Sequence, residues 1–341
     1  MQTPSYPNRP ATIQDVADLA GVSIATVSRV VNGKSPVVAA TAQRVLDAIR
    51  ALNYVPRAAA RILASKRTNT LGLSVPEISG EFFAPMLRGI EAAAGAAGFD
   101  LLIHTTAYKK PEMRHQTLGE HNTDGLLVFI GGLEAAELER LNAIGFPVVF
   151  LHQTPPEGLN IPVVTVENKK GAMLAVDHLI ETHGCRRIVY LSGPAGNEDA
   201  GWRERGYRAA LENHAIPLDP ALIIPGNFSS RASAESVAKL LESGQQFDAI
   251  FSGDDMAAVG AISALREAGL RVPEDVRLVG FDDISLARHL TPPLTTIHAP
   301  TEAVGQIATQ LLLRLVQHEA VELEVLLPTE LTIRQSCGCG V

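Results

Sequence analysis

Apolar residues in the first 55 positions recur every three to four residues, which is the spacing of helices that bury one face. Thr12 precedes the first of these segments, and Asp15, three residues later, completes a variant of the capping box that starts a helix. Gly21 permits a sharp turn, and Ser23 is placed to cap a second helix. A third apolar segment at 45–52 would close the bundle. The pattern therefore predicts an all-α helix-turn-helix headpiece.

From residue 70 onward the pattern changes, because short β-rich runs alternate with helical segments, and this alternation restarts after residue 169. Such a rhythm predicts parallel sheets covered by helices on both faces. Two units in series predict two doubly wound α/β subdomains, with a ligand cleft at the carboxyl ends of their strands. The runs are LGLSV, DLLIHTT, GLLVFI and PVVFL in the first unit, and RRIVYLSG, LIIPGNF, AIFSGDD and VRLVGFDD in the second.

Charge is distributed unevenly along the 341 residues. Residues 1–67 carry nine Lys or Arg against three Asp, whereas the remainder carries 20 basic and 34 acidic residues, so the net charge of −8 hides a basic N-terminal segment. DNA phosphates require local positive charge, and an acidic bulk limits non-specific binding. The segregation indicates a DNA-binding head on an acidic body.

The longest apolar stretches are far shorter than the roughly 20 residues that cross a bilayer, so we expect no membrane partner. The first ten residues have no apolar secretion segment, and the chain has only three cysteines. We therefore expect a cytoplasmic location, with Cys185 reduced in the fold. Cys337 and Cys339 form a C-x-C pair that would suit a metal ion or an oxidant, but a frayed tail is the simpler interpretation.

The second helix carries short outward-facing side chains and one long cation, which suits a helix that enters the major groove. Arg29 can form the bidentate contact to guanine. The competing interpretation is a helical hairpin in a larger bundle. The residues assigned to the groove are Ile24, Ala25, Thr26, Ser28 and Arg29, and those assigned to phosphates are Thr12, Ser23, Thr26 and Asn32.

The segments DVADLAGVS, TVSRVVNG and LNYVPRAAARILASK closely resemble the headpiece of the LacI/GalR family of bacterial transcription regulators, and the resemblance continues through the rest of the chain. It implies that Ile24 and Ala25 help to choose the operator, although short apolar side chains can touch a thymine methyl but form no bidentate hydrogen bonds. To the DNA-contacting positions we add Thr41, Tyr54 and Ala60.

The stretch from Pro56 to Ala64 predicts a short hinge helix, since proline favours its start and alanines favour its continuation. Nine residues are too few for a stable isolated helix, so we expect it to form only with a partner chain and DNA. The resemblance implies that Leu63 wedges open a central base step in the minor groove. The alternative is a plain alanine-rich linker.

Two residues depart from the family pattern. Val38 stands where a Ser usually caps the third helix, and Arg57 stands where a polar cap often opens the hinge helix. We expect each helix start to be less stable by about 1 kcal/mol.

For the larger part of the chain, the resemblance implies a periplasmic-binding-protein-like sensor whose subdomains are joined by three crossover strands, near Glu167, His298 and Leu327. The predicted divisions are 1–55 for the headpiece, 56–67 for the hinge helix and linker, 68–167 with 299–327 for the sensor N-subdomain, 168–298 for the C-subdomain, and 328–341 for a C-terminal strand and tail.

Residues that follow strand ends are the candidates for the cleft, and they match effector-contacting positions of the family. An aromatic face with Arg and Asp suits a sugar, polyol or sugar acid, because rings stack on its flat side and charged groups bind hydroxyls in pairs. A purine is the alternative effector, although Asn197 and Asp199 stand where we expect purine-binding members to have Arg and Thr. The candidates are Phe82, Phe83, His152, Asn197, Asp199, Trp202, Arg203, Phe228, Asp254 and Asp282, of which Arg203 and Asp282 are the best supported.

The pairs Asp254-Asp255 and Asp282-Asp283 also invite a catalytic or metal-binding interpretation. Adjacent acids on a strand point to opposite faces, and no GxSxG, P-loop, HExxH or GxGxxG motif stands at a strand-helix junction. We expect no catalytic residues, no cofactor and no metal. A solute-binding protein that feeds a transporter would share the sensor pattern but would lack the basic headpiece.

These patterns predict a sequence-specific transcription regulator that binds palindromic double-stranded operator DNA as a homodimer, with nothing in favour of a tetramer. A small-molecule effector would alter the angle of the subdomains and thereby allow or prevent formation of the hinge helices. A repressor is our first interpretation; the sequence leaves open an activator, and an inducer or a corepressor as the effector.

Overall fold

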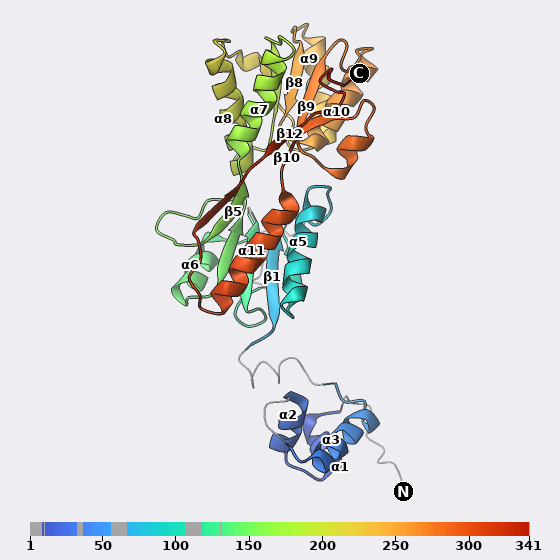
Figure 1. The fold of residues 1–341 in the computed structure, drawn as a ribbon, viewed down its shortest axis with the longest axis vertical. Coiled ribbons are helices and arrows are strands. Elements are labelled where there is room, and N and C mark those ends of the chain that lie inside the picture. The colour runs from blue at the N-terminus through green and yellow to red at the C-terminus, as the bar shows by residue number, and fades with distance from the viewer. Residues whose placement is uncertain are drawn as a thin grey trace. The chain divides into compact units, whose positions relative to one another are not determined.

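A computed structural model describes residues 9, 11–32, 37–55, 67–106, 118–129 and 131–340. The chain divides into two compact units, Met1–Thr68 and Asn69–Val341, which Figure 1 draws together and which we describe separately. The predicted hinge helix at 56–64, with Ala60 and Leu63, lies outside the described residues. Within the described ranges, no helix is long and apolar enough to cross a membrane.

The headpiece consists of three helices, α1 (Ile13–Ala20), α2 (Ile24–Asn32) and α3 (Ala39–Ala51). Gly21 ends α1 in the left-handed conformation, with φ 64°, so the turn that the sequence predicts is present. The helices enclose a small apolar core of Val16, Ala17, Ala20, Val27, Val45, Ala48 and Tyr54.

The capping box of α1 is also present. The backbone N–H of Thr12 donates to the Asp15 carboxylate at 2.8 Å, and the N–H of Asp15 donates to the Thr12 hydroxyl at 3.3 Å. Arg9 adds two contacts of 2.9 Å to the same carboxylate. By contrast, Val38 precedes α3 without a side-chain cap, as the sequence indicates.

The first sensor sheet has the strand order β11-β5-β4-β3-β1-β2, and all of its pairs are parallel. Its strands are β1 (Thr70–Val75), β2 (Asp100–Thr105), β3 (Gly125–Phe129), β4 (Val148–Leu151), β5 (Val163–Val166) and β11 (Glu324–Leu327).

Alternate residues of β3 bury opposite faces of this sheet. Leu127 and Phe129 pack in the cluster that contains α5 (Phe83–Ala96) and α11 (Thr301–Val316), whereas Leu126 and Val128 pack with α6 (Ala135–Ala143). Because both faces are covered, the strand has no polar side, which explains its continuous apolar run.

Helices α5 and α11 lie side by side and touch through two glycines (Figure 1). A Cβ atom on Gly89 would lie 2.0 Å from the Glu302 carbonyl oxygen, and one on Gly305 would lie 2.3 Å from that of Met86. Only glycine therefore permits this close approach of the two backbones.

The second sheet has the order β12-β10-β9-β8-β6-β7, and only the β10-β12 pair is antiparallel. Helices α7 and α8 cover one face, and α9 and α10 cover the other. The strands are β6 (Ile188–Ser192), β7 (Ile223–Pro225), β8 (Ala249–Ser252), β9 (Arg277–Asp282), β10 (Thr295–His298) and β12 (Glu330–Thr332). The helices are α7 (Asn168–Glu181), α8 (Glu198–Asn213), α9 (Ser230–Glu242) and α10 (Asp255–Glu267), and short 3-10 helices occupy Pro220–Leu222 and Ser285–His289.

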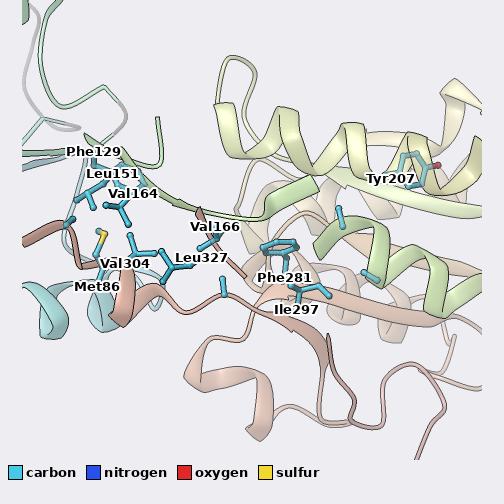
Figure 2. Packing of buried hydrophobic residues seen from close by; sticks show 14 of the residues in the cluster. Met86, Phe129, Leu151, Val164, Val166, Tyr207, Phe281, Ile297, Val304 and Leu327 are labelled. Carbon is cyan, nitrogen blue, oxygen red and sulfur yellow. The ribbon is translucent and has the colours of Figure 1, made fainter. Parts of the chain in front are cut away.

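The chain passes between the two sheets three times, after β5, after β10 and after β11. One apolar cluster extends through the passages: Figure 2 shows Val166 and Leu327 between Met86 and Phe129 of the first subdomain and Phe281 of the second. The predicted fold class, a helix-turn-helix headpiece with two parallel-sheet α/β subdomains, is confirmed.

The expectation of a frayed C-terminal tail is wrong. Cys337 is fully buried, and the Ser336 hydroxyl donates to the Leu278 carbonyl at 2.7 Å while accepting from the Thr295 N–H at 2.8 Å. The tail is held because the Ser336 carbonyl also accepts the Leu278 N–H at 2.9 Å, so this residue is bonded to both β9 and β10.

Candidate functional site

Two regions are candidates, and the first is the exposed face of α2. Ser23 caps this helix, because its hydroxyl accepts the Thr26 N–H at 3.2 Å. Ile24, Ala25 and Arg29 are exposed, whereas Val27 on the opposite side is fully buried. Capping and burial thus fix the helix while leaving three adjacent side chains available to a groove.

The other predicted DNA-contacting residues have varied surroundings. The Thr12 hydroxyl contacts Asp15 at 2.8 Å, so it acts first as a helix cap. Tyr54 is only 7% exposed and packs in the headpiece core, which gives its ring a structural role that the sequence did not reveal. Thr26, Ser28 and Thr41 are half-buried on α2 and α3, and Asn32 is the last residue of α2.

The second region is a cavity of about 750 Å³ between the sensor subdomains. Of the ten predicted effector-binding residues, eight line it: Phe82, Phe83, Asn197, Asp199, Arg203, Phe228, Asp254 and Asp282. Sequence reasoning missed Phe129, the last residue of β3, as well as Asn227 and Met256, which follow β7 and β8, and the loop from Pro76 to Glu81.

Arg203 is the centre of the cleft, and it is only 2% exposed. Its guanidinium donates to the Asn168 side-chain oxygen at 2.8 Å and to the Gly253 carbonyl at 2.6 Å, and it lies 3.0 Å from Asp282. It also sits 3.8 Å from the centre of the Phe281 ring, a cation-π contact. These contacts fix its orientation before any ligand arrives.

A second chain of contacts joins the subdomains. Nδ1 of His152, which follows β4, lies 2.8 Å from the Asp199 carboxylate on α8. Asn168 donates to the same carboxylate at 2.7 Å and thereby connects it to Arg203. Asn168 was missed by sequence reasoning; its position directly after a crossover strand is the signal that could have identified it.

Burial and neighbouring charges divide the carboxylates into two groups. Burial would raise the pKa of Asp199, but His152 and Arg203 outweigh it and lower that pKa. Burial, with the charge of Asp282, raises the pKa of Asp254 to about 7. Burial likewise raises the pKa of Asp282, although Arg203 opposes the effect. The cleft therefore offers one firmly ionised carboxylate beside two that hold protons more readily.

Five residues around the cleft adopt backbone conformations that are uncommon for side chains other than glycine: His152 (φ 57°), Asn227 (φ 52°), Phe228 (φ 52°), Asp282 (φ 101°) and Asp283 (φ 57°). Such conformations cost free energy and are found mainly where a site must hold its side chains in place.

Aromatic rings form the opposite wall. Phe82 meets Phe83, Phe129 and His152 at ring-centre distances of 5.3, 6.1 and 5.6 Å, in edge-to-face arrangements. This is the preferred geometry of aromatic pairs, so the rings stabilise one another's positions in the wall.

Two predicted residues lie elsewhere. Trp202 is 39% exposed and lines a neighbouring cavity of about 440 Å³, with His152 and Thr154. The reason is helical geometry: Trp202 and Arg203 are consecutive, so their side chains point about 100° apart around α8, and Asp199, which lies between these two directions, lines both cavities. We therefore remove Trp202 from the cleft, and we describe His152 as a residue that supports Asp199.

The paired acids separate, although neither pair lies within a strand, because β8 ends at Ser252 and β9 ends at Asp282. Asp254 both lines the cleft and caps α10, since it accepts the Ala257 N–H at 2.9 Å. Asp255 instead accepts from Thr296 at 2.6 Å in the interior. Asp283 accepts from Arg334 at 2.6 Å and so anchors the C-terminal segment. Neither pair forms a joint acidic site.

Two family models match the chain. The model described as "Bacterial regulatory proteins, lacI family" matches residues 12–57, and the model described as "Periplasmic binding protein-like domain" matches residues 176–337. The HTH-type transcriptional repressor PurR of Aliivibrio salmonicida is 36% identical over 308 residues, which cover 89% of this chain and 91% of that protein.

Solved structures are similar to this chain over both the headpiece and the sensor. The complex of transcriptional regulator CelR with cellobiose has a TM-score of 0.71 and 32% identity, and it covers 96% of this chain and 99% of that chain. The Lac repressor dimer bound to operator and the anti-inducer ONPF has a TM-score of 0.83 and 28% identity, with the same coverage.

A helix-turn-helix headpiece joined to a two-part sensor with a polar, buried cleft defines a DNA-binding transcription regulator that responds to a small molecule. The chain belongs to the LacI family of these regulators.

Proposed function

We propose that the protein is a homodimeric repressor that acts on palindromic operator DNA in the cytoplasm and responds to a polyhydroxylated small molecule, namely a sugar, a polyol or a sugar acid. One observation carries the choice of effector: Arg203, Asp254 and Asp282 meet at one wall of a cavity whose other wall is aromatic.

The cavity suits this class in size and chemistry. Its volume of about 750 Å³ lies within the usual range of roughly 300–1,000 Å³ for small-molecule sites. Oδ1 of Asp282 is buried and lies 3.0 Å from the Arg203 guanidinium, and it accepts no hydrogen bond of good geometry among the described residues. A buried acceptor of this kind is available to a ligand hydroxyl, while the rings of Phe82 and Phe228 can pack on the C–H face of a sugar.

A purine is the second candidate, because a purine repressor is among the relatives and because aromatic walls also suit a base. The two classes require different polar partners. A sugar presents several hydroxyls to the two carboxylates and Arg203, whereas a base presents a few donors and acceptors in one plane. The first arrangement fits the convergent acids better.

The proposed control depends on the three passages between subdomains. A ligand that bridges Phe82 of one subdomain and Asp282 of the other would change their relative angle, and the angle would favour or oppose the hinge helices at 56–64. Coupling of this kind is reciprocal, so operator DNA would change effector affinity by the same factor.

A thermal-shift screen of the full chain tests the effector. The panel contains neutral sugars, sugar acids, phosphorylated sugars and purines, and positive compounds are then titrated calorimetrically against wild type, Asp282→Asn and Trp202→Phe. We expect a sugar-class compound to bind wild type and Trp202→Phe alike, and to bind Asp282→Asn at least tenfold more weakly. Binding by purines alone, or equal binding to all three proteins, would contradict the proposed effector.

The DNA-binding half is tested independently. Deletion of residues 1–67 should abolish binding to an operator selected from a random duplex pool while leaving effector binding intact. In the full chain, Leu63→Ala should weaken binding to that operator much more than binding to unrelated DNA, because only the specific complex uses the wedge. Equal losses on both DNAs would exclude the wedge role.

A further inference from the structure

Four side chains that bind transition metals converge beneath the C-terminal tail, and none of them lines the effector cavity. His178 lies in the last turn of α7, His183 follows the end of that helix, and Cys337 and Cys339 belong to the tail. One ligating atom from each lies within 4.8 Å of every other.

Three of the six distances between these atoms match a tetrahedral metal centre, and the other three lie within 4.8 Å. Nε2 of His178 lies 3.4 Å from Sγ of Cys337 and 3.7 Å from Sγ of Cys339, and Nε2 of His183 lies 3.4 Å from Sγ of Cys339. Zinc bonds of about 2.3 Å to sulfur and about 2.0–2.1 Å to nitrogen, at tetrahedral angles, place these atoms about 3.6 Å apart. The two imidazole rings are nearly perpendicular, at 83°, so they do not stack, and one nitrogen of each lies within 4.8 Å of the other ligating atoms.

Neighbouring hydroxyls orient the ligands. The Thr182 hydroxyl lies 3.2 Å from Nδ1 of His178, which leaves Nε2 directed at the cysteines. The Thr295 hydroxyl donates to Sγ of Cys337 at 3.2 Å. Hydrogen bonds to the far nitrogen of a histidine and to a ligating sulfur are the supporting contacts that metal sites in proteins commonly have.

The tail reaches this position through contacts of its own. Ser336 is buried and bonded to β9 and β10, and Gly338 adopts φ 97°, a conformation that brings Cys339 back toward the histidines. The four ligands are therefore brought together by the fold, and the centre is one in which protein atoms occupy all four positions.

We propose that His178, His183, Cys337 and Cys339 bind a single Zn²⁺ ion, or a cation of the same class, as a closed structural site. The ion would fasten the end of the chain to α7. Since Asn168, the first residue of α7, contacts Arg203 and Asp199 in the cleft, the same helix would carry the metal at one end and the effector network at the other. This proposal differs from the earlier expectation of no metal, and it does not depend on the identity of the effector.

Metal content and a cobalt titration test the site in the full chain. Protein purified under reducing conditions without chelator should contain about one zinc ion per chain, as measured by inductively coupled plasma mass spectrometry. After removal of the metal, Co²⁺ should produce the visible absorption of a tetrahedral site together with a thiolate-to-cobalt band. These two bands report the coordination geometry and the sulfur ligands without any measurement of DNA binding.

Cys339→Ser and His183→Gln are the informative variants, because both side chains are only partly buried and their replacement leaves the core intact. Each should weaken metal binding at least tenfold and lose or alter the cobalt bands. Cys185→Ala is the matched control: Cys185 is buried near the same segment but is not one of the four ligands, so metal binding should be unchanged.

The outcomes separate the possibilities. Cobalt bands in wild type and Cys185→Ala that are lost in both ligand variants support the site. Wild-type protein with no zinc and no cobalt bands overturns it, as do bands that survive both ligand substitutions. A disulfide between Cys337 and Cys339 in protein that was never exposed to oxidant, shown by alkylation and mass spectrometry, also overturns it.

Discussion

The residues proposed to recognise DNA in the headpiece and those proposed to bind the effector in the sensor cleft differ in burial and in their spacing along the sequence. On α2 the side chains proposed to read DNA are exposed or half-buried and lie within six consecutive residues, Ile24 to Arg29, above a small core. In the cleft the charged side chains proposed to bind the ligand are buried and the aromatic ones are half-buried, and they come from segments as distant as Phe82 and Asp282.

On α2, the residues proposed to recognise DNA are therefore different from those that stabilise the fold. In the cleft, the same residues are proposed to do both. An exposed Arg29 can be replaced with little effect on folding, because it contributes little to the headpiece core. A buried Arg203 cannot, because its removal leaves carboxylates without a counter-charge in the interior. The operator preference of the protein should therefore change more readily by mutation than its effector preference.

The largest expected effect is that of Arg203→Met. Loss of a buried cation beside Asp282 and Asp199 should lower the free energy of unfolding of the sensor by about 3–5 kcal/mol. Urea unfolding followed by the fluorescence of Trp202, the single tryptophan of the chain, measures it. Arg208→Met, on the same helix but exposed, should change the free energy by well under 1 kcal/mol. Similar losses of unfolding free energy in both variants would show that burial of Arg203 does not make it more important for stability.

Next in size is a pH effect from Asp254. Its pKa in the fold is about 7, against 3.8 for the free side chain, so the native protein retains a proton that the unfolded chain releases. The contribution of Asp254 to stability is therefore fully present at low pH and is lost as the pH rises through about 7. Unfolding of the effector-free protein at a series of pH values should show this loss in wild type and not in Asp254→Asn. Parallel pH profiles would contradict it.

A smaller effect, confined to DNA, is expected for Arg29→Ala. Specific operator binding should weaken by roughly 1–3 kcal/mol, and discrimination should relax at one position of each half-site, while effector binding and sensor unfolding stay unchanged. Titrations against single-base operator variants measure both quantities. Arg44→Ala, an exposed change on α3, is the control; it should leave base preference intact, and a shift of preference there would weaken the role of α2.

The smallest expected effect is an increase in the stability of the headpiece. Val38→Ser supplies the cap that α3 lacks and should stabilise the headpiece by about 1 kcal/mol. Calorimetric unfolding of the full chain, with Val38→Ala as the matched variant that has no capping oxygen, distinguishes a capping effect from a loss of exposed apolar surface. Equal midpoints for the serine and alanine variants would show that no cap forms.

Sequence reasoning identified the elements and most of the cleft because both follow from local pattern. Capping residues mark α1 and α2, alternation marks the sheets, and strand ends mark eight of the ten predicted cleft residues. It failed where the position of a residue depends on the direction of its side chain or on packing against distant parts of the chain. Trp202 is one residue from Arg203 yet faces another cavity, Tyr54 is buried, and the Cys337 tail is held by strands more than 30 residues earlier in the chain.

The order in which the chain is synthesised has a consequence for its regulation. The first sheet receives β11 and the second receives β12 only from residues 324–332, whereas the headpiece core is complete by Tyr54. During translation the helix-turn-helix can therefore fold long before either sheet is finished. A chain truncated by premature termination would have a folded helix-turn-helix headpiece and an incomplete sensor. Such a fragment would not respond to an effector.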